Sequence, residues 1–589
     1  MYEPQQTPAE RGEVYYTAFG GYDRNPVIPE TSFYDETNLS ADGFPLLQPR
    51  PKRAFFSVAG DDLHGLVSKK KLCYVLNGRL FYGGVEVAGV NLPPVSRPRR
   101  FVSMGAKLVI FPDKVYVNTA DLSDFGPLEA AVTTASGSTV TLTPCSVDGE
   151  PLQNCATAAA EPTDPADGAL WIDTSRSPAV LRCYSSALSI WEELVETYVR
   201  LSCPGVGVPF REGDGVTLAG VTADPDLNGA HVLVARGDDY LVVAGLTPGT
   251  VSQTGAVTVS RTVPELDFVC ESGNRLWGCC STRNEIYASK LGDPTNWNCY
   301  AGLATDSYAV TVGTDGDFTG AVPFRGYILF FKENCVHKVY GANPPYTVLT
   351  SYLRGVQKGS ERSLVVLNEL LFYKSPTGVC CYEGGVPTDV SAALGRQRYT
   401  DAVAGTLGDK LYLCVSDAAG VRTLFTYDTV RGVWHREDHV DVREFCTHNG
   451  NLFFIAADGD TLRLGTVDSE HMVGSFTAAL AGWTTEEDVP WSAETGMWGL
   501  GLPQQKYYSQ ISLRLIGERG ARVSVACEYD SSGVWQTVKT WRAETTGTVT
   551  LPFACPRCDH LRLRLSGTGR VRLLGVAATV EKGSRTCMT

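Results

Sequence analysis

One short phrase returns along the chain at a nearly constant interval, and it limits the possible folds more than any other feature. In each copy a polar or Gly-containing turn leads into four or five apolar residues, followed by a second turn and a shorter strand-like stretch. A period of about 40 residues filled with short strands is typical of β-propeller blades. An open antiparallel meander is the alternative, but the regular spacing favours the propeller. The first Leu or Ile of successive copies falls at Leu276, Ile328, Leu370, Leu411 and Leu452.

The phrase also occurs earlier, at Lys71–Val75 and Lys107–Phe111, so the predicted propeller begins near His64. About 150 residues then pass without it. We therefore predict an insertion between two blades, which loop-closure entropy tolerates because its cost grows slowly with length. Ser138–Thr143 alternates polar and apolar residues, and short strand-like runs lie between Gly and Asp turns, which indicates a small β-domain.

The two ends of the chain have their own character. The first residues contain several turn signals and prolines without a sustained period, which predicts an extended arm. Beyond Asp468, five of the ten tryptophans accompany strands with one polar face, such as Leu561–Leu565, which predicts a β-sandwich. The expected fold is therefore all-β, with about seven propeller blades. The predicted domains are an arm (1–63), first blades (64–129), an inserted β-domain (130–262), remaining blades (263–470) and a C-terminal β-sandwich (471–589).

Composition points to a soluble, folded protein. The chain has 589 residues and is 43% hydrophobic, and no run approaches the roughly 18 apolar residues that span a bilayer. The opening Met1–Gln6 lacks a basic and then apolar signal, so we expect synthesis in a cytoplasm. Many of the 18 cysteines lie in apolar runs, where reduced, buried thiols are expected.

Three motifs resemble metal sites, and each has a simpler explanation. His435–His439 contains two His and a Glu, but the Glu is central and the run follows a strand, unlike the helical zinc-protease motif. Cys555–Cys558 has the spacing of half a zinc ribbon with His560 nearby, but the chain has no second Cys-x-x-Cys. Asp315–Asp317 and Asp458–Asp460 lack the spaced carboxylates of a calcium loop, so blade turns explain them.

No catalytic constellation is recognisable. The sequence has neither a Gly-x-Ser-x-Gly elbow nor a phosphate-binding glycine loop, so we predict no enzyme activity, no cofactor and no metal. With a formal net charge of −14, the protein is not expected to grip nucleic acid over its whole surface. Two basic stretches are candidates for contacts with DNA or a partner. They comprise Lys69, Lys70 and Lys71, and Arg97, Arg99 and Arg100.

Several phrases resemble a family of bacteriophage tail proteins with propellers. They are Ser289–Trp297 followed by Gly320–Asn334 and Val336–Gly341, and they are similar to the tail nozzle, also called the DNA-stabilisation or tail tubular protein, of short-tailed phages. The opening around Asn38–Ser40 and the ending Arg557–Arg562 are similar to phage virion proteins. The insertion and the Trp-rich end depart from the minimal pattern.

This resemblance implies a structural component of a virion tail, made in the host cytoplasm. A nozzle would be a homo-oligomeric, sixfold ring below the portal and adaptor that forms part of the DNA channel and retains packaged DNA. Its partners would be other tail proteins, with transient, non-specific contact with genomic DNA. A glycan-binding receptor or baseplate protein is the main alternative, which the tryptophans motivate, and an enzyme on a propeller scaffold is a third.

Overall fold

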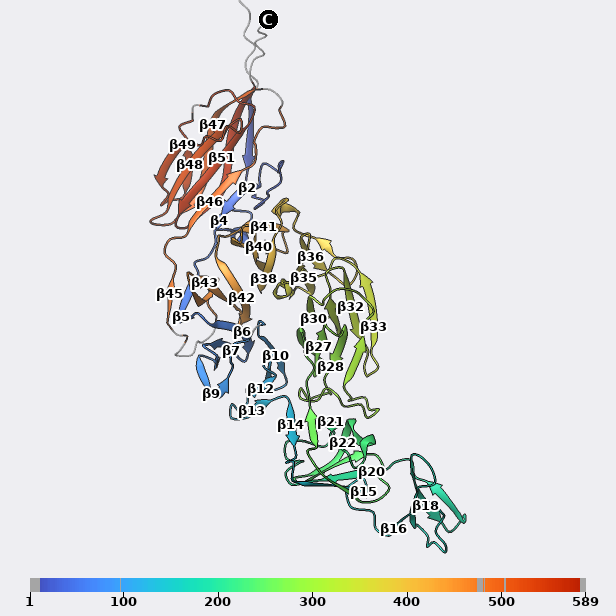
Figure 1. The fold of residues 1–589 in the computed structure, drawn as a ribbon. Coiled ribbons are helices and arrows are strands. Elements are labelled where there is room, and N and C mark those ends of the chain that lie inside the picture. Colours follow the sequence, from blue (N-terminus) through green and yellow to red (C-terminus); the bar gives the residue numbers. More distant parts are fainter. Residues whose placement is uncertain are drawn as a thin grey trace, which may run out of the picture. The chain divides into compact units, whose positions relative to one another are not determined.

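The computed structural model describes residues 11–95, 97–473, 480, 482–502, 505–553 and 555–582. Within these residues the chain is all-β, as predicted, and its helical elements are four short 3-10 turns (Figure 1). No helix among them is long and apolar enough to cross a membrane. The opening Met1–Gln6 lies outside the described residues. The 3-10 turns are η1 (Ala41–Gly43), η2 (Pro225–Leu227), η3 (Glu361–Ser363) and η4 (Ala392–Leu394).

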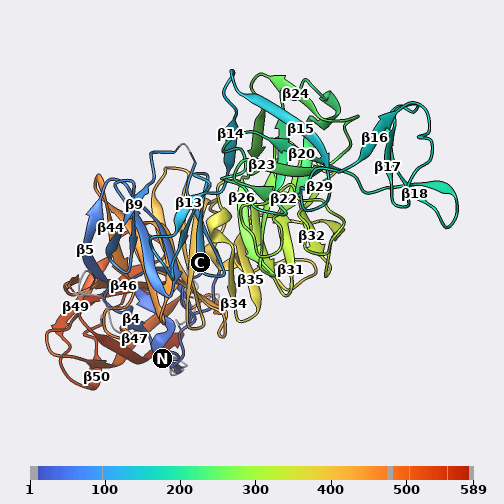
Figure 2. The same ribbon diagram turned by 90° about the horizontal axis from the view of Figure 1, so that it is seen from below.

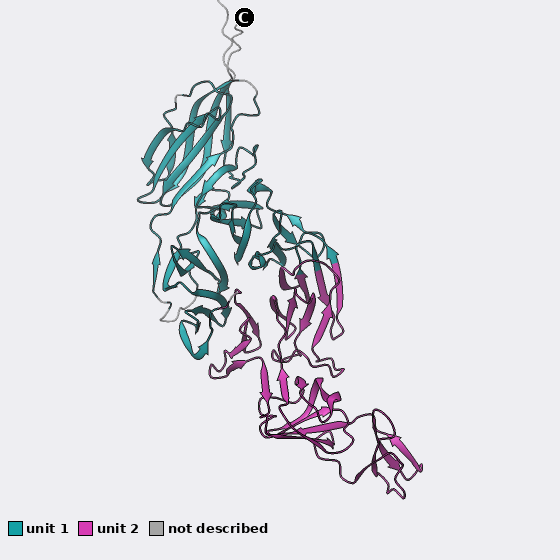
Figure 3. Ribbon diagram, in the orientation of Figure 1, with its two compact units in different colours: residues 1–94, 331–336, 351–589 teal, residues 95–330, 337–350 magenta. Residues whose placement is uncertain are grey.

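The chain forms two compact units, shown in different colours in Figure 3. The first unit comprises residues 1–94, 331–336 and 351–589, and the second comprises residues 95–330 and 337–350. Seven blades are present in the described residues, together with an inserted β-domain and a C-terminal β-sandwich. The predicted propeller with its inserted β-domain and C-terminal β-sandwich is therefore confirmed.

The first unit contains four blades. Each is an antiparallel sheet whose strands follow one another in sequence, except that the last borrows a strand from the N-terminal segment. The complete blades are β6 (Leu63–Lys69), β7 (Lys71–Leu76), β8 (Arg79–Tyr82) and β9 (Val85–Asn91); β34 (Val365–Leu367), β35 (Leu370–Lys374), β36 (Val379–Tyr382) and β37 (Thr388–Asp389); and β38 (Thr400–Leu407), β39 (Lys410–Ser416), β40 (Arg422–Asp428) and β41 (Val433–Arg436).

The last blade is completed from the other end of the chain. It contains β42 (Asp441–His448), β43 (Asn451–Asp458) and β44 (Thr461–Thr466), and β5 (Ala54–Gly60) pairs antiparallel with β44. A short strand, β45 (Trp483–Thr485), pairs with the opposite edge of β5. Phe56 of β5 is buried between strands, with its ring 5.8 Å from the ring of Phe453. The N-terminal segment is therefore part of a blade.

The C-terminal sandwich also uses N-terminal strands. Its four-stranded sheet has the order β1-β52-β47-β50 and its five-stranded sheet the order β2-β46-β51-β48-β49, so each sheet has an N-terminal strand at one edge (Figure 1). The strands are β1 (Arg11–Tyr16), β52 (Val571–Lys582), β47 (Lys506–Gly517) and β50 (Gly547–Thr550); and β2 (Phe33–Thr37), β46 (Pro490–Thr495), β51 (Leu561–Thr568), β48 (Arg522–Tyr529) and β49 (Gln536–Arg542). A small ribbon joins β3 (Leu39–Ser40) to β4 (Gln48–Pro49).

The described part of the predicted extended arm, residues 11–63, contains strands that pair with distant parts of the chain. β1 pairs with β52 from Arg11 opposite Glu581 to Tyr16 opposite Val576, and β2 pairs with β46. These pairings satisfy backbone groups that an edge strand would leave open. Prolines and turns in this segment mark the corners between its strands rather than a lack of structure.

Two of the five tryptophans near the C-terminus are core residues. Trp491 and Trp498 are buried among the aliphatic side chains between the two sheets, and the indole N–H of Trp498 donates to the carbonyl of Glu30 at 3.0 Å. Trp535 and Trp541 are half-buried, and Trp483 is partly exposed beside β5. Trp491, Trp498 and Trp541 contribute to the packing of the sandwich, a role that aromatic side chains often have.

The second unit contains three blades, the last of which also includes a few residues assigned to the first unit. They are β10 (Arg100–Met104), β11 (Lys107–Phe111), β12 (Val115–Asn118) and β13 (Phe125–Pro127); β26 (Phe268–Ser272), β27 (Arg275–Cys280), β28 (Glu285–Ala288) and β29 (Tyr308–Thr311); and β30 (Gly320–Phe324), β31 (Tyr327–Phe331), β32 (Cys335–Tyr340) and β33 (Thr347–Tyr352). The repeated sequence phrase forms the second strand of each blade, and turn residues at positive φ such as Asn274 and Gly326 precede it.

The insertion between β13 and β26 contains two sheets rather than one, both labelled in Figure 2. The larger is eight-stranded: β14 (Ala130–Thr133), β25 (Thr258–Arg261), β21 (Gly215–Ala219), β22 (Gly229–Gly237), β23 (Tyr240–Ala244), β20 (Tyr198–Ser202), β15 (Thr139–Cys145) and β24 (Val251–Thr254). The smaller, which we call the outer module, spans residues 155–195 and contains β16 (Cys155–Ala158), β17 (Leu170–Asp173), β18 (Val180–Ser185) and β19 (Ile190–Glu193).

The borrowed strand β5 gives a direct test of the fold. Replacing Phe56 by Ala removes a ring that is 1% exposed and packs against Phe453, so we expect a loss of about 3–5 kcal/mol in the free energy of unfolding. Ser57→Ala, on the exposed face of the same strand, is the control and should change it by less than about 0.5 kcal/mol. Urea unfolding measures both, and equal midpoints for the two variants would contradict the pairing of β5 with β44.

Candidate functional site

The first predicted basic stretch divides into one buried and two exposed lysines. Lys69 ends β6 and is only 8% exposed, so it is not a surface contact. Lys70 is exposed in the turn, with φ of +56°, and Lys71 is exposed at the start of β7 with its ammonium 5.1 Å from the centre of the Tyr82 ring. Of the three candidate lysines, Lys69 is therefore buried, while Lys70 and Lys71 remain candidates for contacts with DNA or a partner.

The second basic stretch is engaged within the protein. The guanidinium of Arg99 is buried and forms a bidentate pair with Asp113, at 2.9 and 3.0 Å. Arg97 pairs with the Asp267 carboxylate at 3.1 Å, and Arg100 donates to the Asp267 carbonyl at 3.2 Å. Arg99 is therefore unavailable to phosphate, while Arg97 and Arg100 fasten the start of β10 to the start of β26. The two basic stretches belong to different units.

The His435–His439 run serves a structural network. Nδ1 of His435 lies 2.9 Å from Oε1 of Glu36, which also accepts the backbone N–H of Arg436 at 2.9 Å. Glu437 and Asp438 face Arg53, with nitrogen to oxygen distances of 2.6 and 2.8 Å. These contacts tie His435, Glu437 and Asp438 to the N-terminal residues Glu36 and Arg53.

Arg50 and Arg53 form the centre of a buried charge cluster. Arg50 pairs with Glu486 at 2.7 Å and with Asp438 at 3.2 Å, and Glu437 lies within reach of both arginines. Burial alone would raise the pKa of Asp438, but the two guanidinium groups overcome it and lower that pKa to about 2. The pKa of Glu486 is lowered in the same way. Removing one partner of such a cluster leaves a buried, unpaired charge.

The residues of the Cys555–Cys558 motif have partners within the protein. The Sγ atoms of Cys555 and Cys558 lie 3.9 Å apart, and His560 is engaged with Ser531 at 2.7 Å. None of the described cysteines forms a disulfide. Among the described residues, one group has metal-ligand composition and spacing: Asp468, Glu470 and His471. The side chains of this group already have partners. Asp468 accepts hydrogen bonds from the backbone N–H groups of Glu470 and His471 and from Nδ1 of His471. Glu470 forms an ion pair with Arg570.

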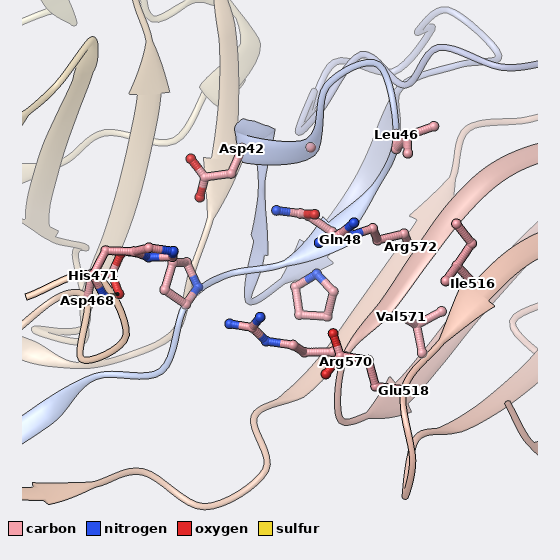
Figure 4. A pocket seen from close by; sticks show the side chains of 13 residues that line it. Asp42, Leu46, Gln48, Asp468, His471, Ile516, Glu518, Arg570, Val571 and Arg572 are labelled. Atoms are coloured by element: carbon pink, nitrogen blue, oxygen red, sulfur yellow. Dashed lines mark hydrogen bonds and ion pairs between the residues drawn. The ribbon is translucent and has the colours of Figure 1, made fainter. Parts of the chain in front are cut away.

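A cavity of about 570 Å³ lies beside this turn, in the first unit. Figure 4 shows Gln48 and Arg570 pointing into the space that Asp42 and His471 also border. Asp42 pairs with Lys410, and burial, which would raise its pKa, is outweighed by that lysine, so the pKa of Asp42 is lowered. Both signs of charge are present, and the charged groups of Asp42, Asp468, His471 and Arg570 are paired within the protein. The cavity therefore has the character of a polar seam where β4, the turn after β44 and the ends of β47 and β52 meet.

Lys374 is a further buried ionisable group, near a small cavity in the first unit. Burial lowers its pKa to about 8, and its ammonium donates to the side chain of Gln357 at 3.0 Å and to the carbonyl of Ser375. A lysine with a lowered pKa is a potential nucleophile. Both of its contacts hold it against its own strand and loop, so it acts here as a structural donor.

No family model matches the chain, and no curated protein matches it in sequence. Among solved structures, an exo-β-1,3-galactanase from Phanerochaete chrysosporium has 12% identity and a TM-score of 0.22, covering 53% of this chain and 94% of that one. Hsv2 of Kluyvelomyces marxianus has 12% identity and a TM-score of 0.25, covering 62% and 95%. An engineered GH43 glycoside hydrolase has 10% identity and a TM-score of 0.20, covering 53% and 97%.

The charge cluster predicts a specific sensitivity to acid. Asp438 has a folded-state pKa of about 2 against an ordinary 3.8, so its pairing contributes about 2 kcal/mol that is fully present above about pH 4. This stability is lost as the pH falls through 2. Asp438→Asn should lower the unfolding temperature at pH 7 and reduce its further fall between pH 4 and 2.

The control for this experiment is Asp148→Asn, which makes the same charge change on an exposed turn of the second unit. Differential scanning calorimetry across this pH range measures both variants. Parallel curves for wild type and Asp438→Asn would show that the cluster does not contribute as described.

Proposed function

We propose that the protein is a structural component of a bacteriophage tail that acts by assembly with other proteins. The observation that carries this proposal is the exposed aliphatic surface of the outer module. Leu188 and Ile190 are 62% and 49% exposed, and Leu194 and Val195 are 38% and 89% exposed, all within eight residues of sequence. Scattered exposed apolar side chains are normal, but such a concentration is typical of a surface that another protein covers.

We call this exposed aliphatic surface, formed by Leu188, Ile190, Leu194 and Val195, the tip of the outer module. The charged residues around it indicate the chemistry of the partner. Between residues 155 and 195 the acidic residues are Glu161, Asp164, Asp167, Asp173, Glu192 and Glu193, and the basic ones are Arg176 and Arg182. Six acids against two bases give the module a formal charge of −4. A complementary partner therefore offers an apolar centre with a basic rim. Contacts between Trp171, Tyr184 and Trp191 support the sheet from which the tip extends.

The rest of the second unit holds the insertion firmly. Asn296 is 1% exposed and accepts the N–H of Gly215 at 3.1 Å while donating to the carbonyl of Gly213 at 2.7 Å. Asp214 and Arg261 form a buried ion pair at the same junction. Asn296 belongs to the Ser289–Trp297 phrase that resembles the phage family, so this phrase seats the inserted domain on a blade. The resemblance thus rests on framework residues, as expected for a structural protein.

We extend the proposal to a nozzle-like, sixfold ring below the portal and adaptor that forms part of the DNA channel. The net charge of −14 favours this role, because a channel wall that repels polyanion lets DNA slide. The pairing of Arg99 with Asp113 within the protein is in keeping with weak binding of the protein to DNA. The protein would then reside in the virion tail, with the insertion and the C-terminal domain supplying much of the contact with neighbours.

The outer module provides the test of assembly. In phage particles that carry Leu188→Ser and Val195→Ser, we expect at least about a tenfold loss of this protein, because two aliphatic side chains lose their burial. Quantitative mass spectrometry of purified particles measures it, and the copy number relative to the portal tests the sixfold ring.

Val386→Ser is the matched control, since this valine is 88% exposed in the first unit, away from the module. The purified double variant should unfold at the same temperature as the wild type. Absence of the wild-type protein from particles would overturn the tail function itself, whereas normal incorporation of the double variant would exclude only the contact through this tip.

Contact with DNA should be weak and independent of sequence. Only a few phosphates can meet exposed lysines such as Lys70 and Lys71, so affinity should fall as salt rises through counterion release. The double variant Lys70→Ser, Lys71→Ser should bind DNA with a weaker dependence on salt. The slope of the logarithm of the binding constant against the logarithm of the salt concentration should become less steep by about 0.9 for each phosphate that these lysines neutralise in the wild type. Duplex binding by fluorescence anisotropy checks this, with exposed Arg176→Ser as control. Tight, sequence-selective binding at physiological salt would contradict a passive channel.

A further inference from the structure

A small cavity of about 150 Å³ lies within the second unit, at the ends of two consecutive blades. The end of β26 provides Ser272, and the start of β27 provides Arg275 and Trp277. The end of β32 provides Tyr340, and the loop after it provides Asn343 and Tyr346. At about 30 Å³ for each water molecule, the space holds about five waters, which is enough for one small polar ring. No acidic residue lines it.

Packed aromatic rings form one wall of the cavity. The ring of Tyr346 meets the ring of Trp277 at 4.8 Å and 72°, and it meets the ring of Tyr308 at 5.1 Å and 82°. The indole N–H of Trp277 donates to the carbonyl of Ser272 at 3.2 Å, which fixes the ring in place. These edge-to-face contacts make the wall rigid before any ligand arrives.

Arg275 places a buried positive charge beside this wall. It is 3% exposed, and its terminal nitrogens donate to the carbonyls of Ser289 and Ala304, each at 2.8 Å, and to the carbonyl of Asp306. Burial lowers the pKa of Arg275, and the nearby charges of Tyr346 and Asp306 offset this effect only in part. Carbonyl oxygens hold the guanidinium in position but do not neutralise its charge, so the cavity favours an anionic group.

Several polar groups at the cavity have no hydrogen-bond partner among the described residues. They are Nε of Arg275, Oγ of Ser272, the hydroxyls of Tyr340 and Tyr346, and the side-chain amide of Asn343. Tyr346 is 9% exposed and Tyr340 is 41% exposed, so one lies deep and the other at the mouth. Pro344 and Pro345 stiffen the loop that carries these residues.

We propose that this cavity binds a single acidic sugar unit of a glycan, of the hexuronic acid class. The carboxylate of the sugar meets Arg275, and its hydroxyls meet the tyrosine hydroxyls, Ser272 and Asn343. The apolar face of its ring packs on the exposed ring of Tyr340 and on the accessible edge of Tyr346, which Trp277 supports from within. A few oriented polar groups beside an aromatic wall are typical of small-ligand pockets.

The chemistry distinguishes this ligand from two simpler ones. A neutral sugar would leave the charge of Arg275 without a partner, and an inorganic phosphate would leave the aromatic wall unused. The proposal is independent of assembly through the outer module, because the cavity and that tip share no residue. It adds a recognition site to the proposed tail protein, where surface glycans of a host would be the source of such a sugar.

The test uses the purified full chain with methyl β-glucuronide, methyl β-glucoside and inorganic phosphate as probes. We expect the glucuronide to bind with a Kd of about 1 mM and the glucoside at least about tenfold more weakly. Saturation-transfer difference NMR detects the contacts of the sugar ring, and titration gives the affinities. Phosphate should not displace the glucuronide at equal concentration.

Two variants locate the site. Asn343→Asp adds a negative charge beside the expected carboxylate and should weaken the glucuronide at least about tenfold, with little effect on the glucoside. Asn343 is exposed, so the variant should fold normally. Tyr346→Phe removes one hydroxyl and should weaken the glucuronide about fivefold. Asn154→Asp, the same change on an exposed turn of the insertion, should have no effect.

Three results would overturn the proposal. The first is the absence of saturation transfer from the glucuronide at about 20 mM, well above the expected Kd. The second is unchanged affinity in both Asn343→Asp and Tyr346→Phe, which would place binding elsewhere. The third is displacement by phosphate as effective as by the glucuronide itself, which would identify a general anion site. Circular dichroism of each variant confirms that it is folded.

Discussion

Backbone pairing between the first and the last strands of the chain is the interaction on which the first unit depends. β1 and β2 supply one edge strand to each sheet of the sandwich, and β5 supplies a strand to the last blade. An unpaired strand exposes a row of hydrogen-bonding groups, so these pairings both stabilise the sheets and close their edges. The same segment brings Arg50 and Arg53 against Glu437, Asp438 and Glu486, so buried charges fix the position that the backbone pairing selects.

The parts of the fold that depend on local sequence were predictable. Leu276, Leu370 and Leu411 each mark the second strand of a blade, because a turn residue and an apolar run are enough to define it. The pairing of β5 with β44 was not predictable in this way. Its partners are about four hundred residues apart in sequence, and nothing in Ala54–Gly60 specifies a particular edge. The small, separate sheet of the outer module was missed for a similar reason, since its strands resemble those of the larger sheet in the same insertion.

For the candidate sites, too, the sequence predicted what depends on local residues and missed what depends on contacts between distant ones. Lys69 and Lys70 are neighbours of one residue type, yet one is buried and the other exposed, because successive strand residues face opposite sides and a turn follows. Arg99 looked like part of a basic stretch until the hairpin brought Asp113 to it. The cavity at Arg275 escaped sequence analysis because its residues come from separate turns between positions 272 and 346. An arginine in an apolar run, Arg275-Leu276-Trp277, was the one local signal for it.

The pairing of the two chain ends also sets an order of events during synthesis. β1 is made well before its partner β52, which follows some 560 residues later. At about 5–20 residues per second, β1 waits on the order of a minute for this partner. The blades can form their local hairpins in that time, and the last blade can close once β44 and β45 are made, whereas the sandwich cannot. Until β52 is made, the sandwich therefore keeps open edges whose unpaired backbone groups can pair with another chain.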